Sequence, residues 1–304
     1  EIMLQQTQVK TVVQYFDRFM LRFPTVQDLG HASWDEVAPL WAGLGYYARA
    51  RNLHKAAGTV TKKGEFPKIL EEWIELSGVG PSTAGALMSL GLRQFGVIMD
   101  GNVKRVLSRY FALEGDSTSS VFIKNIWQTA EALTPQTRAH DYNQAIMDLG
   151  ATICTPKKPL CLYCPMQSDC AALITNRVLE LPQKPARKAT PTRHAIVLMI
   201  QHNHRLLWQQ RPSKGLWGGL WSLPVIENDL EKTLENLNLI NGIDGKKIRH
   251  TFTHFHWELQ AIHFDINVSQ KKTMETHFSP ARWMNDDEAF SSGVPEAMRK
   301  LLAK

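Results

Sequence analysis

The chain has 304 residues, of which 43% are hydrophobic and 21% charged, and its formal net charge is +6. The length allows two domains with their own cores, and the composition excludes a wholly disordered or fibrous protein. No apolar run is long enough to span a bilayer and no signal segment opens the sequence, so we expect a cytoplasmic protein without a membrane partner.

The first half of the sequence is predicted to be helical. Apolar residues recur on one 3.6-residue face near the start, at Val9, Val12, Val13, Phe16, Phe19 and Met20. Further along, glycine and proline at 43–45, 78–81 and 100–102 indicate short loops between helices. The sequence opens at Glu1, directly in a helical pattern, so we expect further residues to precede it in the complete protein.

Residues 182–193 are rich in proline and basic side chains and predict a linker, and the pattern of apolar residues changes after them. After it, residues 195–210 predict a β-hairpin, residues 250–266 a second hairpin, and residues 295–304 a helix. We therefore predict an all-α domain at 1–181 and a smaller α+β domain at 194–304.

All of the cysteines lie in one short segment, at Cys154, Cys161, Cys164 and Cys170. Disulfides are disfavoured because the cysteines are clustered and no secretory signal is present. Structural zinc normally uses two Cys-x2-Cys pairs, whereas only Cys161 and Cys164 form such a pair here. A cubane iron–sulfur cluster needs four converging thiolates, which one loop can supply, so the spacing favours a cluster over zinc.

Two loops of the helical half suggest functional backbone geometry. Gly78, Val79 and Gly80 precede a predicted helix, and their N–H groups are suited to binding phosphate, although an ordinary interhelical turn is the alternative. Asp100 and Asn102 precede another predicted helix, where aspartate is a good N-cap.

Together these motifs resemble the endonuclease III and MutY group of helix-hairpin-helix DNA glycosylases. The cysteine spacing is similar to the [4Fe–4S] loop of that group, in which the cluster is mainly structural and shapes a basic, DNA-facing loop, here with Lys157 and Lys158. The resemblance implies that Asp100 is the catalytic aspartate and that Asn102 supports it. Ser82 stands where bifunctional members carry a Schiff-base lysine, which implies a glycosylase without lyase activity.

The opening residues, EIMLQQTQV, resemble the adenine-specific MutY branch. The resemblance implies that Glu1 is a general acid at adenine N7, and that Asp100 stabilises the oxocarbenium-like sugar. Gln144 and Ser82 are then expected to bind the flipped adenine.

The same resemblance implies residues that contact DNA beside the opposing oxidised guanine. They are Gln6, Thr7, Leu44 and Tyr46, of which Tyr46 and Gln6 act as wedges, and the backbone of Gly78, Val79 and Gly80 binds the DNA.

The second half resembles the Nudix-type fold that is appended to MutY proteins, through GLWGGLWSLP at 215–224. The clustered glutamates that hold magnesium in hydrolases of this fold are missing from the sequence, so we expect a recognition domain. Phe252, Thr253 and His254 are similar to the family's 8-oxoguanine-reading loop, with Thr253 where serine is usual. A histidine metal site at His250, His254 and His256 is the disfavoured alternative.

The resemblance covers nearly the whole chain and implies a multidomain, monofunctional adenine DNA glycosylase of base excision repair. We expect it to be a nucleoid-associated monomer with a [4Fe–4S] cluster, acting on double-stranded DNA with an 8-oxoguanine:adenine or guanine:adenine mispair. The alternatives are a thymine mismatch glycosylase or a lyase of the same superfamily, a non-catalytic iron–sulfur DNA-binding or redox-sensing protein, and a nucleotide pyrophosphatase.

Overall fold

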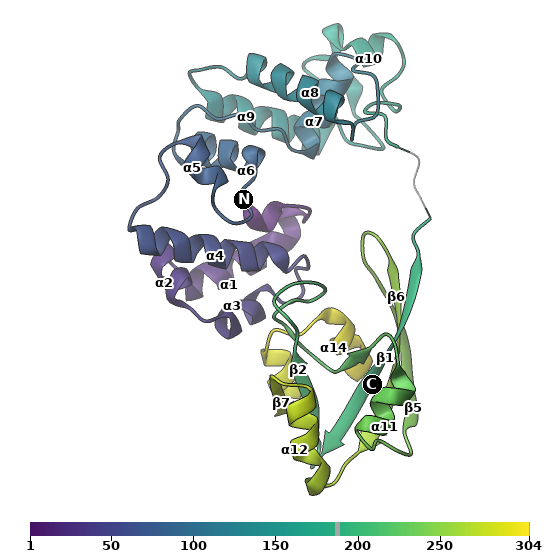
Figure 1. The fold of residues 1–304 in the computed structure, drawn as a ribbon. Coiled ribbons are helices and arrows are strands. Elements are labelled where there is room, and N and C mark those ends of the chain that lie inside the picture. The colour runs from purple at the N-terminus through teal and green to yellow at the C-terminus, as the bar shows by residue number, and fades with distance from the viewer. Residues whose placement is uncertain (186–188, 304) are drawn as a thin grey trace. The chain divides into compact units, whose positions relative to one another are not determined.

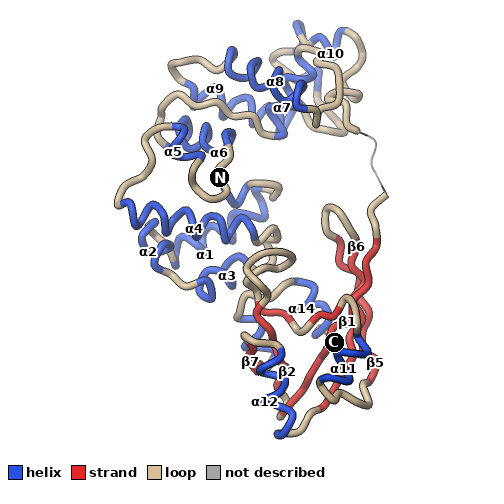
Figure 2. Tube along the Cα trace, viewed as in Figure 1, coloured by secondary structure: helices blue, strands red, loops and turns tan. Residues whose placement is uncertain are grey.

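The computed structural model describes residues 1–185 and 189–303, so residues 186–188 of the predicted linker lie outside the described part. The described residues form two compact units, one with residues 1–2 and 63–185 and the other with residues 3–62 and 189–303. Among the described residues every strand follows residue 191, after a helical first part, which is the predicted order; strands are red and helices blue in Figure 2. Within the described ranges, no helix is both long and apolar enough to cross a membrane.

The first unit is helical (Figure 1). Its helices are α5 (Leu70–Ile74), α6 (Pro81–Ala86), α7 (Gly101–Tyr110), α8 (Ser120–Leu133), α9 (Ala139–Asp148) and α10 (Ala171–Ile174). Short π-helical turns extend α6 through Leu87–Gly91 and α9 through Leu149–Ile153. Helices α7, α8 and α9 enclose a core to which Val106, Phe122 and Ile146 contribute.

Helices α5 and α6 form a helical hairpin whose loop explains its glycines and proline. Gly78 has a φ of 78°, a left-handed conformation that glycine adopts without steric cost. Gly80 is the N-cap of α6 and Pro81 its first residue, where the missing proline N–H is not needed by the helix. The short interhelical loop predicted at 78–81 is therefore confirmed.

The second unit begins with a 3-10 turn (Ile2–Leu4) and the helices α1 (Val9–Arg22), α2 (Val26–His31), α3 (Trp34–Trp41) and α4 (Ala48–Lys63). The predicted first helix is confirmed, and of the apolar residues on its predicted face Val12 and Phe19 are buried. Phe19 packs edge-on against Trp41, whereas Val9 and Phe16 are exposed. The packed stripe is thus narrower than the apolar pattern suggests.

The rest of the second unit is an α+β domain, and its described strands form a seven-stranded sheet. The strands are β1 (Thr192–His202), β2 (Arg205–Gln210), β3 (Trp221–Ser222), β4 (Val225–Ile226), β5 (Ile243–Thr251), β6 (His256–Asp265) and β7 (Ala281–Met284). Their order is β3-β2-β1-β6-β5, with β4 paired to β1 and β7 to β2, and only β1 and β6 run parallel among these pairs. Both predicted hairpins, β1–β2 and β5–β6, are confirmed.

Helices cover both faces of this sheet. They are α11 (Leu230–Asn236), α12 (Val268–His277), α13 (Asp286–Ser291) and α14 (Glu296–Leu302). On one face Leu198 packs with Met274 of α12, and on the other Val197 packs with Met298 of α14. Neighbouring residues of β1 thus belong to hydrophobic cores on opposite faces of the sheet, because side chains alternate along a strand.

Candidate active site

The carboxylate of Asp100 is held in place at the start of α7. Asp100 is the N-cap residue, and its Oδ1 accepts from the backbone N–H of Asn102 at 2.9 Å and of Val103 at 2.8 Å. The Asn102 side chain donates from Nδ2 to Asp100 Oδ2 at 3.1 Å. Three donors therefore fix the orientation of both carboxylate oxygens, and the helix N-terminus favours their negative charge.

Ser82 connects the helical hairpin to this site. The hydroxyl of Ser82, on α6, accepts from the backbone N–H of Met99 at 3.1 Å, and Met99 directly precedes Asp100. In the hairpin loop, the Val79 N–H already donates to Leu76 O at 3.1 Å. A phosphate would therefore depend on the other backbone groups of this loop rather than on that of Val79.

Arg105 links the Asp100 site to the cysteine segment. Its NH2 donates to Asn102 Oδ1 at 2.8 Å and to Gly150 O at 2.7 Å, and its Nε donates to Cys154 O at 2.7 Å. One guanidinium thus joins the side chain that orients Asp100 to the backbone of the first cysteine. Burial lowers the pKa of Arg105, an effect that Cys154 opposes.

The cysteine segment folds around a second arginine of α7. Arg109 is 2% exposed, and its guanidinium donates to the sulfur of Cys154 at 3.3 Å and to the backbone oxygens of Thr155, Pro156 and Leu181 at 2.8, 3.1 and 3.0 Å. The Cys170 thiol donates to the backbone oxygen of Arg109 at 3.7 Å. Both ends of the segment therefore rest on this one residue.

Three of the cysteines lie close enough to act on the thiol of the fourth, Cys161. Burial raises the pKa of the Cys161 thiol, and Cys154, Cys170 and Cys164 raise it further, whereas the Arg109 guanidinium lowers it. Within the described ranges, no group of three or more histidine, cysteine, aspartate or glutamate residues is arranged to hold a metal ion. The thiols thus share one neighbourhood without forming the tight arrangement that a single ion needs.

The residues predicted to act on adenine lie in the first unit. Gln144, on α9, is exposed and donates from Nε2 to Asp148 Oδ1 at 2.9 Å, one helical turn away. Glu1 is exposed and directly precedes the 3-10 turn. The structure therefore joins Asp100, Asn102 and Ser82 through hydrogen bonds, and it places Gln144 in a separate pair.

The predicted wedge residues lie in the second unit and share backbone strain. Gln6 and Tyr46 have φ values of 56° and 49°, a left-handed conformation uncommon for residues other than glycine. Tyr46 is 47% exposed, whereas Leu44 is only 6% exposed. Strained conformations of this kind cluster at functional sites.

Arg49 holds the two wedge segments together. It is 9% exposed, donates to Thr7 Oγ1 at 3.0 Å and to Gly45 O at 3.4 Å, and lies 5.4 Å from the centre of the Tyr46 ring. The sequence assigned no individual role to Arg49, Arg105 or Arg109; the mixture of aromatic and arginine residues at 43–54 indicated only a DNA-facing surface, whereas Arg49 is buried. The available signal was the four-residue spacing of Arg105 and Arg109, which places both on one face of α7.

The loop between β5 and β6 presents two polar side chains on an aromatic base. Thr253 and His254 are exposed, and their Oγ1 and Nδ1 atoms are 3.3 Å apart. Below them Phe252 stacks on Phe255, with ring centres 4.7 Å apart, and its backbone N–H donates to Phe255 O at 2.9 Å. The loop is therefore a turn closed by a backbone hydrogen bond and supported by the packed rings of Phe252 and Phe255.

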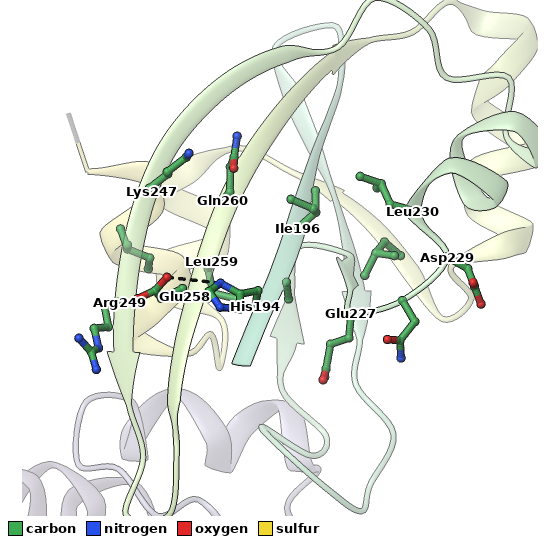
Figure 3. A pocket seen from close by; sticks show the side chains of 14 residues that line it. His194, Ile196, Glu227, Asp229, Leu230, Lys247, Arg249, Glu258, Leu259 and Gln260 are labelled. Carbon is green, nitrogen blue, oxygen red and sulfur yellow. Dashed lines mark ion pairs between the residues drawn. The ribbon is translucent and has the colours of Figure 1, made fainter. Parts of the chain in front are cut away.

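A hollow of about 540 Å³ lies on the face of the sheet that α11 covers, beside the start of that helix (Figure 3). Figure 3 shows Glu227 and Asp229 on one side of it and Lys247 and Arg249 on strand β5 opposite. Glu227 and Asp229 lie in the loop between β4 and α11, whereas Glu258 on β6 is paired with His194 at 3.3 Å. The expected absence of pyrophosphohydrolase chemistry stays a prediction.

Comparisons with known proteins agree with this architecture. Residues 1–152 match the family model described as HhH-GPD superfamily base excision DNA repair protein, and residues 195–304 match the NUDIX domain. The chain is 34% identical to the adenine DNA glycosylase of Buchnera aphidicola subsp. Acyrthosiphon pisum, over 99% of this chain and 87% of the relative. It is 32% identical to the human adenine DNA glycosylase, over 99% of this chain and 66% of the relative.

Among solved structures, a thermostable thymine-DNA glycosylase is 30% identical with a TM-score of 0.52, over 57% of this chain and 81% of that one. The matched ranges confirm the predicted fold class, in which an all-α helix-hairpin-helix domain precedes a Nudix-like α+β domain. The exact boundaries at 181 and 194 stay predictions.

Proposed function

This chain belongs to the adenine DNA glycosylase family, and we propose that Glu1 and Asp100 are the two carboxylates with which it removes adenine from DNA. It is a DNA N-glycosylase of base excision repair. The observation that carries the proposed roles is the Asp100 carboxylate, which three donors hold in one orientation at a helix N-terminus.

In the proposed reaction, Glu1 donates a proton to N7 of the flipped adenine. The electrons of the N-glycosidic bond then leave with the protonated base, and positive charge develops on the sugar. The fixed Asp100 carboxylate stabilises that charge without having to reorient during the reaction. Water adds to C1′ and returns one proton to the Glu1 carboxylate, so that atoms and charges balance.

Substrate selection is proposed to involve both units. Gln144 pairs with the edge of adenine through its amide, and Ser82 helps to line the same site. The strained residues Gln6 and Tyr46 fill the gap left by the flipped base and lie beside the opposing oxidised guanine, with Thr7 and Leu44 nearby. Oxidised guanine, or guanine, is proposed as the base opposite.

The loop at 252–254 is the proposed reader of that opposite base. Thr253 and His254 are exposed and carry hydrogen-bonding groups, while Phe252 anchors the turn from below. The backbone N–H groups of Gly78 and Gly80 and the side chains of Lys157 and Lys158 are proposed to contact DNA phosphates, whereas Val79, whose N–H donates to Leu76 O, is proposed only to shape this loop. The protein would act on double-stranded DNA as a monomer.

We further propose that Cys154, Cys161, Cys164 and Cys170 hold a [4Fe–4S] cluster. The fit is supported by the closeness of the other three cysteines to Cys161 and by the buried Arg109 guanidinium, which offsets the negative charge that four thiolates carry. A cubane cluster is larger than a single ion, so its ligands surround it at wider spacing than zinc ligands do. When bound, the cluster would supply rigidity to the basic loop rather than redox chemistry in base removal.

Absence of a lyase step is proposed from the residue at position 82. A serine hydroxyl cannot form the imine that a lysine forms with the opened sugar. Ser82 is moreover engaged as an acceptor for Met99 N–H.

The test is a single-turnover assay on duplexes carrying adenine opposite 8-oxoguanine, adenine opposite guanine, or thymine opposite guanine. We expect excision of adenine from the first two, strand cleavage only after alkali, and no covalent complex after borohydride treatment. Glu1→Gln should abolish excision but leave duplex binding intact. Excision of thymine would favour a mismatch glycosylase of different specificity, and binding without any excision would favour a non-catalytic protein.

A further inference from the structure

A loop of the Nudix-like domain is held by helices from the other end of the chain. The segment at 215–220, here termed the bridge loop, lies between β2 and β3 within the second unit. Trp34 of α3 donates from its indole N–H to Gly219 O at 2.9 Å, and Arg51 of α4 donates to Gly218 O at 2.6 Å. These contacts join segments that lie in the two different family matches.

The opposite side of the bridge loop supports the proposed reading loop. Trp217 is 7% exposed, and its ring centre lies 6.0 Å from that of Phe252 and 5.9 Å from that of His250. It also lies 5.0 Å from the ring of Trp257 on β6. Trp217 therefore belongs to the group of aromatic rings that pack against Phe252.

The backbone of the bridge loop has two residues in the left-handed conformation and passes close to Trp34. Trp217 has a φ of 53°, although it is not glycine, and Gly219 has a φ of 74°. A Cβ atom on Gly219 would lie 2.9 Å from the Trp34 indole nitrogen. Such a conformation persists only where surrounding contacts hold it, and here the carbonyl contacts of Trp34 and Arg51 do so.

The same helices contact the domain at further points. Asp35 pairs with Arg282 at 3.0 Å, and the Tyr47 hydroxyl donates to Val294 O at 3.5 Å. Ala38 belongs to the buried cluster that contains Phe255 and Trp257, and Tyr47, the neighbour of Tyr46, packs against that cluster. Tyr46 and Phe252 are thus each tied to one shared core.

We propose that Trp34 and Arg51, acting through the bridge loop, are positioning residues that fix the loop at 252–254 relative to Tyr46 and thereby set discrimination of the base opposite adenine. This inference rests on the proposed function, in which both segments face the strand opposite the adenine. A reader and a wedge that contact one base together must keep their spacing, because small displacements weaken directional hydrogen bonds.

The test compares Arg51→Met with a matched control, Arg205→Met. Arg205 is also an arginine of the second unit that donates to a backbone oxygen, that of Trp283 at 3.0 Å, but it lies outside the bridge-loop contacts. The Kd is measured for duplexes with 8-oxoguanine or guanine opposite 2′-fluoro-2′-deoxyadenosine, which resists excision, and single-turnover rates are measured with ordinary adenine.

We expect Arg51→Met to reduce the preference for 8-oxoguanine over guanine about tenfold, the effect of losing one well-placed hydrogen bond to a charged donor. Arg205→Met should keep the wild-type preference. Trp34→Phe, which retains a ring but removes the indole donor, should act in the same direction, and Arg51→Lys should restore part of the preference. Thermal unfolding shows whether each variant is folded.

An equal loss of affinity on both duplexes, or an unchanged ratio in folded Arg51→Met and Trp34→Phe, would overturn the proposal, because a merely structural contact has no reason to favour one base. If the wild type binds 8-oxoguanine preferentially but does not excise adenine, the proposed reaction fails while the Kd ratio still decides this inference. If the wild type binds the two duplexes equally well, both the proposed recognition of 8-oxoguanine and this inference are overturned.

Discussion

Replacement of Arg105 by methionine should damage both the stability of the helical unit and the chemistry at Asp100. Methionine keeps a long apolar side chain but removes the donors to Asn102 Oδ1, Gly150 O and Cys154 O. Each acceptor left without its partner costs about 1–3 kcal/mol, so we expect a total loss of about 3 kcal/mol after water reaches part of the site. The corresponding fall in Tm is roughly 6–12 °C.

The effect on catalysis follows from the freed Asn102 amide. Without Arg105 the amide can rotate, and Asp100 Oδ2 then loses a fixed donor. We expect the single-turnover rate of adenine excision to fall about tenfold to a hundredfold, because misplacement of a catalytic group by about 1 Å has effects of this size.

Scanning calorimetry and a single-turnover assay at saturating enzyme measure the two effects separately. Lys104→Met is the matched control, since Lys104 is a basic neighbour on α7 whose ammonium group donates to Ser117 O over a long 3.4 Å. The control should change stability by less than about 1 kcal/mol. If Arg105→Met has the Tm and the rate of this control, the link between Asp100 and the cysteine segment has no energetic role.

Three further predictions concern separate parts of the chain. Asn102→Ala should lower the single-turnover rate about tenfold to a hundredfold with little change in duplex Kd, and an unchanged rate would contradict its role. Burial lowers the pKa of His250, so its contribution to stability is complete above the ordinary value of 6.5 and is lost as pH falls below it. The urea midpoint of unfolding should therefore fall less between pH 7.5 and pH 5.5 in His250→Phe than in the wild type. An equal fall of the midpoint in both proteins would refute this. Cys161→Ser should reduce bound iron and the visible absorbance of the cluster and lower Tm, whereas undiminished iron content would exclude Cys161 as a ligand.

Local patterns predicted the elements of the fold well. Glycine and proline at 78–81 indicated the helical hairpin because a left-handed residue and a helix start require them there. The continuous apolar run at 195–200, followed by a polar turn and a second strand-like run, indicated a hairpin, and Asp100 was predicted and found as an N-cap. These features depend on neighbours in the chain and so can be inferred from sequence.

Contacts between distant segments were not predictable in the same way. Arg109 donates to Leu181 O, 72 residues away, and Trp34 donates to Gly219 O, 185 residues away. Backbone oxygens carry no side-chain signature, so nothing in the sequence identifies them as partners of these residues. For the same reason the sequence did not indicate that residues 3–62 form one compact unit with the second domain.

The most direct test of the central claim is the single-turnover release of free adenine from an 8-oxoguanine:adenine duplex by the wild type, Asp100→Asn and Asp116→Asn. Asp116 is a suitable control because its carboxylate also accepts a backbone N–H, from Thr118 at 2.8 Å, in the same unit. We predict that Asp100→Asn lowers the rate about a thousandfold or more while Asp116→Asn retains it. A rate for Asp100→Asn close to that of the control would contradict the assignment of Asp100 as the residue that stabilises the sugar.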